Sequence, residues 1–270
     1  MPTLRISDAD AIAYDDAGQG PVVVLVHGSP GTSRAWQPVA ERLAARFRVI
    51  APNLPGYGAT TRPAGEGPGD SSYAAGLIEA LIAEVGPPAV LAGHSYGGAV
   101  ALVTALRGRI KPRALALFEP VAVPVLAAVG EMAAFAAAQA LFEGYCAAFE
   151  RGDREAARIM VDYWFGVGAL DQMPAPIREF LIAHTGHNVR DVRATFRDPY
   201  SVPALRGLTM PVLCAYGSRS SAMMVKIVEA IASHTPRGII KKIEKANHAM
   251  TTTHAEAVAT LITELADGSA

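Results

Sequence analysis

The stretch AVLAGHSYGG, residues 89–98, decides how the rest of the chain is interpreted. Its first four residues are apolar, as in a strand that is buried on both faces of a parallel sheet. Residues 93–97 then read G-x-S-x-G, and a helical pattern begins at Tyr96. In this strand–turn–helix setting the glycines let strand and helix approach closely around an exposed serine. Free N–H groups at the helix N-terminus favour developing negative charge, so we expect Ser95 to be a nucleophile rather than only a helix cap.

Apolar runs similar to residues 89–92 recur along the chain, and helix-length segments separate most of them. The sequence predicts strands at 22–26, 48–51, 89–92, 114–118, 211–216 and 238–243. It predicts helices at 33–45, 72–84, 96–106, 222–233 and 253–265. Strands that alternate with helices form βαβ units, so we expect an α/β fold with a mostly parallel central sheet flanked by helices.

The alternation stops after Pro120 and resumes near Pro211. Between these prolines the chain has little strand character. We therefore expect a core formed by residues 1–120 and 204–270, with a helical cap inserted at residues 121–203.

Three helices are expected in the inserted segment. Asp153 would cap the second, which ends near Phe165, and Pro174 and Pro176 would open the third. Some aromatic residues of these helices could line an apolar pocket above the sheet, and others could only pack the insertion against itself. One side of the first helix carries residues at steps of three and seven, namely Met132, Phe135, Phe142 and Phe149.

A second loop that could take part in catalysis is HGSPG, residues 27–31, directly after the strand at 22–26. Its backbone can aim an N–H group at the same point as the amide of Tyr96. Two such donors form an oxyanion hole, and the contributor from this loop would be Ser29, because the next residue is proline and lacks an N–H. We expect His27 to order the loop by hydrogen bonding rather than to act as a base.

A serine hydroxyl needs a neighbouring base, and His248 is the best candidate among the histidines. It follows the last strand, at the carboxyl edge of the sheet where ligands bind in open α/β folds. His94 adjoins Ser95, but its side chain should point away from the serine. The others are expected in the cap or at helix ends: His184, His187, His234 and His254.

These motifs together resemble the α/β-hydrolase superfamily, and the resemblance covers nearly the whole chain. The helical insertion falls where that family carries its cap. Residues 52–58, PNLPGYG, resemble the family's D-x-x-G-x-G loop, with Asn53 in place of the acid. Such loops are structural, so we assign Asn53 no chemistry.

The resemblance fails at the third member of the expected triad. The family usually places an Asp after the strand at 211–216, yet the loop GSRSS, residues 217–221, has no carboxylate. Glu119 ends the preceding strand, and FEPVA, residues 118–122, resembles the segment that carries the acid in one group of haloalkane dehalogenases. We expect Glu119 to orient His248. A Ser–His dyad and another carboxylate such as Glu244 are the alternatives.

A serine nucleophile with an oxyanion hole indicates acyl transfer without a metal or organic cofactor, so dehalogenase and epoxide hydrolase activities are rejected. We expect a small or medium hydrophobic ester, lactone or thioester as the small-molecule substrate. Carbon–carbon bond hydrolysis, cofactor-free perhydrolysis, hydroxynitrile cleavage and non-catalytic ligand binding stay open. Arg190 and Arg193 could hold a carboxylate or be solvated. The residues expected to bind substrate are Trp164, Phe135, Phe142 and Tyr145, with Met132, Phe149 and Phe165 as further apolar wall.

Composition excludes several other classes of protein. The 270 residues include 51% hydrophobic residues and carry a formal net charge of −1, which gives no general attraction for nucleic acid. Cys146 and Cys214 lack metal-ligand spacing and suggest no disulfide framework. No secretory signal or uninterrupted membrane span is expected, so we predict a cytoplasmic protein. The sequence leaves the oligomeric state open.

Overall fold

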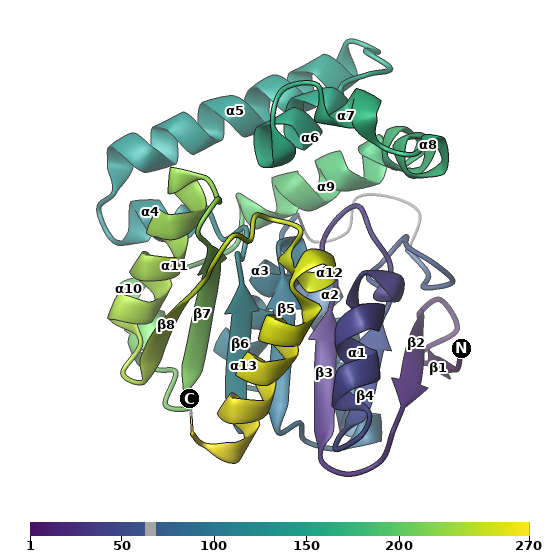
Figure 1. The fold of residues 1–270 in the computed structure, drawn as a ribbon, viewed down its shortest axis with the longest axis vertical. Helices are drawn as coiled ribbons and strands as arrows, with labels where there is room; N and C mark the ends of the chain where they lie inside the picture. Colours follow the sequence, from purple (N-terminus) through teal and green to yellow (C-terminus); the bar gives the residue numbers. More distant parts are fainter. Residues whose placement is uncertain (63–68, 270) are drawn as a thin grey trace.

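The computed structural model describes residues 1–62 and 69–269, and its centre is an eight-stranded sheet (Figure 1). The strand order is β1-β2-β4-β3-β5-β6-β7-β8. β1 and β2 are antiparallel to their neighbours, and the other strands are parallel. The strands are β1 Thr3–Arg5, β2 Ala11–Ala17, β3 Val22–Val26, β4 Arg48–Pro52, β5 Val90–His94, β6 Ala114–Phe118, β7 Val212–Gly217 and β8 Gly238–Ile243.

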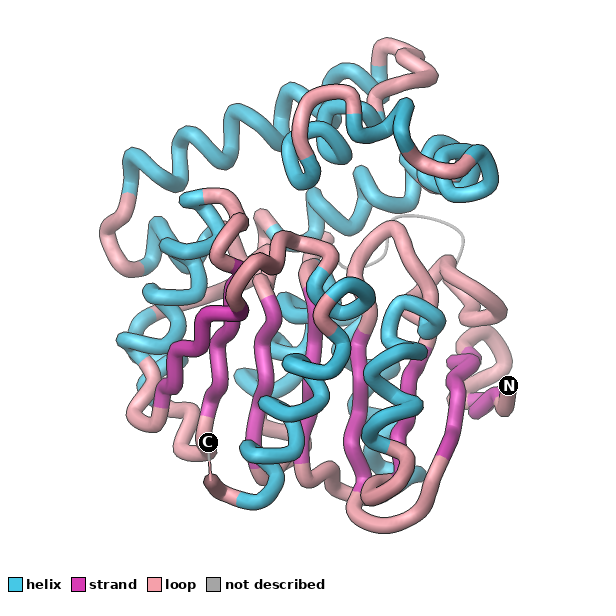
Figure 2. Tube along the Cα trace, viewed as in Figure 1, coloured by secondary structure: helices cyan, strands magenta, loops and turns pink. Residues whose placement is uncertain are grey.

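Helices cover both faces of the sheet, as the alternating sequence predicts (Figures 1 and 2). Apolar side chains of α1 and α13 pack with one face of the strands. The other face packs against α2, α3 and α11. The central strands have uninterrupted apolar sequences because both of their faces are buried. These helices span α1 Gln37–Leu43, α2 Ser72–Val85, α3 Tyr96–Leu106, α11 Ala222–His234 and α13 Ala255–Asp267, with a 3₁₀ turn η1 at Ser33–Trp36 and a short α12 at Met250–Thr253.

Two strands at the N-terminus were not predicted from the sequence. β2 is AIAYDDA, and its last residues are acidic, unlike the apolar central strands. The strand lies towards one edge of the sheet, where Asp16 remains accessible to solvent and forms an ion pair with Arg48 of β4 at 2.7 Å. A strand near an edge has less need of apolar residues, so its sequence signal is weak.

The segment between β6 and β7 is helical, and its described residues form no strand. α5 to α9 lie above the carboxyl ends of the parallel strands (Figure 1). α6 begins at Ala157, so the prediction that Asp153 caps it is wrong: the Asp153 carboxylate instead accepts a hydrogen bond from the Glu155 amide in the preceding turn. The helices are α4 Pro124–Ala128, α5 Met132–Glu150, α6 Ala157–Phe165, α7 Ala169–Gln172, α8 Ala175–Ala183, α9 Thr185–Thr195 and α10 Val202–Arg206.

The long helix α5 is apolar enough, by length and composition, to cross a membrane. Its mean hydropathy is 1.2, and 28% of the 18-residue window is buried. One such helix is weak evidence for a membrane span, because core helices meet the same criterion. In this fold α5 contributes Phe142, Tyr145 and Cys146 to the core shared with the sheet.

The tight turn between β5 and α3 makes a first prediction. A Cβ atom on Gly93 would lie 2.2 Å from the carbonyl oxygen of Gly97, which is backbone and has no room to move. Gly93→Ala should therefore lower the free energy of unfolding by about 1–3 kcal/mol or more, as overpacking does. The measurement is the urea midpoint of unfolding.

The control substitution is Gly144→Ala in α5. A Cβ atom there meets nothing within 4 Å. Alanine should stabilise the exposed helix by about 0.5–1 kcal/mol. Equal unfolding midpoints for Gly93→Ala and the wild type would contradict this account of the turn.

Candidate active site

Ser95 lies at the sharp turn that the G-x-S-x-G pattern predicts. It follows β5 and precedes α3, with φ 56° and ψ −125°. This left-handed φ is unfavourable for a side chain larger than glycine, and the structure holds it by close packing on both sides. A Cβ on Gly97 would lie 2.3 Å from the carbonyl oxygens of both Val26 and His27, so strand β3 touches the start of α3.

Three side chains far apart in the sequence form a hydrogen-bonded chain at this turn. The Ser95 hydroxyl lies 3.0 Å from Nε2 of His248. The Nδ1–H of His248 donates to Oε2 of Glu119 at 2.7 Å. All three residues are buried, and Glu119 has no exposed surface. The arrangement has the geometry of a nucleophile, a base and a carboxylate that fixes the tautomer of the base.

Glu119 follows the last residue of β6 and has a φ of 46°. Its second oxygen, Oε1, accepts hydrogen bonds from the Gly217 amide at 2.9 Å and from the Ser220 hydroxyl. The last residue of β7 and the loop after it therefore offer donors to a carboxylate that directly follows the neighbouring strand β6. Glu244, the other carboxylate considered from the sequence, is exposed and pairs with Lys242.

The surroundings of Glu119 keep its carboxyl group ionised. Burial alone would raise the pKa of Glu119, but the hydrogen bond and charge of His248 oppose that effect. The hydrogen bonds from Ser220 and Gly217 lower the pKa further, so that the pKa of Glu119 lies below its ordinary value. An ionised partner is what an imidazole needs when it becomes cationic.

His248 is held by two further contacts. The indole of Trp164, from α6, stacks on its ring with the centroids 4.1 Å apart and the planes at 14°. The Nε2–H of His94 donates to the backbone carbonyl of His248 at 2.8 Å. Burial, with a smaller effect from the charge of His248, lowers the pKa of His94 to about 3. His94 is therefore a neutral donor that supports the loop of His248.

The loop of residues 27–31 lies against Ser95 on its other side. A Cβ on Gly28 would come within 2.9 Å of the Ser95 Cβ. His27 orders the loop: its Nδ1–H donates to the Gly28 carbonyl at 2.7 Å, and its Nε2 accepts from the Leu54 amide at 2.9 Å. Burial lowers the pKa of His27 to about 4, so the ring stays neutral in this role.

Ser29 and Tyr96 both line the cavity next to Ser95. Tyr96 is the first residue of α3, so its amide has no partner within the helix. Within the described part of the chain, the amide of Ser29 has no hydrogen-bond acceptor. Two residues that line the cavity with Ser95 thus have amides that can donate to an oxyanion.

A cavity of about 410 Å³ lies between the sheet edge and the helical insertion. Ser95, His248, Trp164, Phe142 and Tyr145 all line it. Further apolar lining that the sequence did not predict comes from α6, α8, α9 and the turn between α7 and α8, namely Met160, Val161, Met173, Ile177, Leu181 and Val192. A cavity of this size and lining suits a small apolar ligand.

One predicted substrate-binding residue requires a correction. Phe135 does not line the cavity; its ring packs beside that of Phe196, with the centroids 6.3 Å apart. Met132 and Phe149 are also absent from the lining, and their exposed fractions are 57% and 37%. The step of three and seven residues correctly places these side chains on one helix, but α5 turns only its middle part towards the cavity.

The charged groups of the cavity lining decide between the two roles left open for Arg190 and Arg193. None of the described lining residues is Lys or Arg, whereas Asp191 of α9 is among them. Arg193 forms an ion pair with Glu150 at the surface, and Arg190 is exposed. Neither arginine is placed to hold a carboxylate of a ligand in this cavity.

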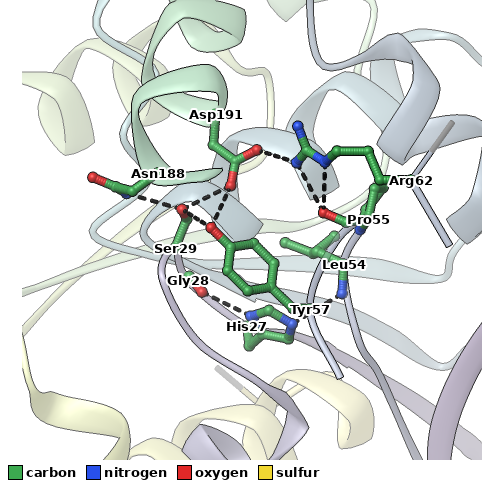
Figure 3. A network of polar contacts seen from close by, with 9 residues as sticks. All are labelled: His27, Gly28, Ser29, Leu54, Pro55, Tyr57, Arg62, Asn188 and Asp191. Carbon is green, nitrogen blue, oxygen red and sulfur yellow. Dashed lines mark hydrogen bonds and ion pairs between the residues drawn. The ribbon is translucent and has the colours of Figure 1, made fainter. Parts of the chain in front are cut away.

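A polar network joins α9 to two loops of the sheet (Figure 3). Asp191 accepts hydrogen bonds from Ser29 at 2.7 Å and Tyr57 at 2.8 Å, and it pairs with Arg62 at 2.6 Å. The Asn188 side-chain amide donates to the Ser29 hydroxyl at 2.9 Å. The sequence did not predict this network, because its members are scattered polar residues without a motif.

The remaining histidines of the insertion serve packing. His184 stacks on the Tyr57 ring, and His187 meets the same ring edge-on. His234 ends α11, and His254 precedes α13, as predicted.

In residues 1–62 and 69–269, no group of three or more His, Cys, Asp or Glu side chains lies close enough to hold a metal ion.

Comparison with known proteins establishes the family. Residues 23–261 match the Alpha/beta hydrolase family, so the chain belongs to it. An alpha/beta hydrolase from Sphaerobacter thermophilus has a similar structure, with a TM-score of 0.75 and 24% identity over 98% of this chain and 99% of that one. A thermophilic esterase from Thermogutta terrifontis gives a TM-score of 0.73 and 24% identity over 96% of this chain and 94% of that one. At these identities the likeness shows a shared fold.

Sequence relatives match over a shorter region. The 2-hydroxy-6-oxo-2,4-heptadienoate hydrolase of Pseudomonas putida is 41% identical over 111 residues, which is 40% of this chain and 40% of that protein. Across the most similar curated relatives, the aligned part spans between 25% and 40% of their length.

Proposed function

We propose that this protein is a serine hydrolase that cleaves small or medium hydrophobic carboxylic esters, lactones or thioesters. The observation that carries the proposal is the hydrogen-bonded chain from Ser95 through His248 to Glu119, which opens onto an apolar cavity. In acyl transfer, a serine serves as nucleophile, an imidazole hydrogen-bonded to it serves as base, and a buried carboxylate orients that imidazole.

In this proposal Ser95 attacks the substrate carbonyl while His248 takes the hydroxyl proton. Glu119 keeps the Nδ1–H of His248 in place and offsets the positive charge of the imidazolium. The amides of Ser29 and Tyr96 donate to the oxyanion that forms. His248 returns the proton to the leaving group, and an acyl-enzyme remains on Ser95. A water molecule, activated by His248, then releases the acid.

The cavity supports uncharged substrates. Its lining is predominantly apolar, and Asp191, the acidic residue in the described lining, is already paired with Arg62 at 2.6 Å. A free carboxylate on the substrate would enter this apolar space without a described cationic lining residue to pair with. Esters whose acyl chain fills the space beside Trp164 and Phe142 fit these conditions best.

Carbon–carbon bond hydrolysis is a second candidate, and the relative from Pseudomonas putida favours it. The compound in that protein's name has a ketone and a carboxylate but no ester, so its hydrolysis breaks a carbon–carbon bond. The lack of Lys and Arg in the described lining here counts against a substrate of that charge. Parallel assays of p-nitrophenyl butyrate and an anionic dienoate would separate the two candidates.

The first test concerns the nucleophile. Ser95→Ala should abolish p-nitrophenyl butyrate hydrolysis and covalent labelling by a fluorophosphonate, because the attacking oxygen is gone. The matched control is Ser201→Ala, which removes a hydroxyl that caps α10 outside the site. It should keep wild-type turnover.

Two outcomes would contradict the proposal. Turnover retained in Ser95→Ala would remove the serine mechanism. A folded wild-type protein that neither hydrolyses esters nor reacts with the fluorophosphonate would instead indicate a ligand-binding protein.

A second test concerns the cavity wall. Trp164 lines the cavity and stacks on His248, whereas Phe135 packs outside it on Phe196. Trp164→Ala should shift the preference among p-nitrophenyl esters towards longer acyl chains, since the cavity gains volume. Phe135→Ala should lower thermal stability and leave the preference unchanged. Identical chain-length profiles for the two variants would refute the assignment of the wall.

A further inference from the structure

We propose that Asp191 is a positioning residue for the hydrolytic reaction: through the Ser29 hydroxyl, it holds the oxyanion loop in place and ties that loop to the helical insertion. The inference rests on the proposed function, because it concerns the amide of Ser29 as an oxyanion donor. Figure 3 shows the side chains involved.

Asp191 is a buried carboxylate, and both of its oxygens accept hydrogen bonds from protein groups. Its side chain is 2% exposed. Oδ2 accepts from the Ser29 hydroxyl at 2.7 Å and from the Tyr57 hydroxyl at 2.8 Å, while Oδ1 accepts from Arg62 at 2.6 Å. Since its oxygens are already engaged by protein donors, Asp191 is suited to act on the loop rather than to bind substrate directly.

Ser29 is the point where this network meets the reaction. Its hydroxyl donates to Asp191 at 2.7 Å and accepts from the side-chain amide of Asn188 at 2.9 Å. The amide of the same residue is the proposed oxyanion donor, and Ser29 lines the cavity together with Ser95. The loop has little freedom beside Ser95, because a Cβ on Gly28 would come within 2.9 Å of the Ser95 Cβ. A side chain held by two hydrogen bonds therefore restrains the backbone amide of its own residue.

The network also connects the insertion with the sheet. Asp191 and Asn188 lie on α9, whereas Ser29 follows β3 and Tyr57 follows β4. On the far side, the amide oxygen of Asn188 accepts from the Tyr145 hydroxyl of α5 at 2.7 Å. A shift of α9 would consequently move the Ser29 hydroxyl, so the seating of the insertion and the geometry of the oxyanion hole are coupled.

The chemistry of the network favours positioning over simple adhesion. An apolar contact of similar volume could attach α9 to the sheet at least as well, since a buried ion pair gives little net stability. What the buried carboxylate adds is direction: it accepts two hydroxyl groups and one guanidinium in a single arrangement. Such polar networks specify one geometry when all members are satisfied.

The test compares Asp191→Asn with Ser29→Ala in the esterase assay. Asp191→Asn loses the ion pair with Arg62 and one acceptor, and Ser29→Ala removes the hydroxyl but keeps the amide. Each should lower kcat for p-nitrophenyl butyrate by about tenfold or more, with KM changed much less, because a displaced donor mainly affects the transition state. The rate of fluorophosphonate labelling should fall in parallel. The double variant should be no slower than the slower single variant.

The matched control is Asp198→Asn. Asp198 is also a buried carboxylate and follows α9 by three residues, but it accepts from the amide and hydroxyl of Ser71 and from Tyr200 and does not line the cavity. Its substitution should lower the unfolding midpoint and leave kcat unchanged. A merely structural Asp191 would behave in the same way as Asp198.

The outcomes separate the inference from the proposed function. Wild-type kcat in folded Asp191→Asn or in Ser29→Ala overturns the inference. Should Asp191→Asn fail to fold, Ser29→Ala decides the question alone, since it changes only a side chain at the loop. An inactive and unlabelled wild-type protein overturns the proposed function first. Loss of kcat confined to Asp191→Asn and Ser29→Ala supports the inference.

Discussion

The site depends on one interaction, the hydrogen bond between the buried carboxylate of Glu119 and His248 at 2.7 Å. A carboxylate without exposed surface is unfavourable unless other groups satisfy it. Here the imidazole, the Gly217 amide and the Ser220 hydroxyl do so. The end of β7 and the loop after it thus supply hydrogen-bond donors to the carboxylate that follows β6. The hydrogen bond between Glu119 and His248 holds the imidazole within reach of Ser95.

The fold brings these groups together because parallel strands end at one edge of the sheet. Ser95 follows β5 and Glu119 follows the neighbouring β6, while His248 comes from the loop after β8. The helical insertion then closes the space above them. It contributes Trp164 to the face of His248 and Asp191 to the loop of Ser29, so it shapes both the apolar cavity and the polar support of the proposed reaction centre.

Much of this could be predicted from the sequence, for identifiable reasons. Buried strands and the glycine-bounded turn at Ser95 leave strong local patterns, and Glu119 stood out because the usual acid position holds none. Asp191 left no such signal: its partner Ser29 lies 162 residues away, and α9 is a mostly polar helix. Phe135 was misplaced because helical spacing defines a side of a helix but not which part of that side meets a cavity.

The most direct measurement of the central claim is the kcat of Glu119→Gln beside that of Glu244→Gln. Glutamine keeps the size of the side chain but loses the charge that favours the correct tautomer of His248. We predict that Glu119→Gln stays folded and that its kcat for p-nitrophenyl butyrate falls by about 10²–10⁴-fold. Glu244→Gln, at the surface, should match the wild type. A wild-type rate in Glu119→Gln would contradict the account.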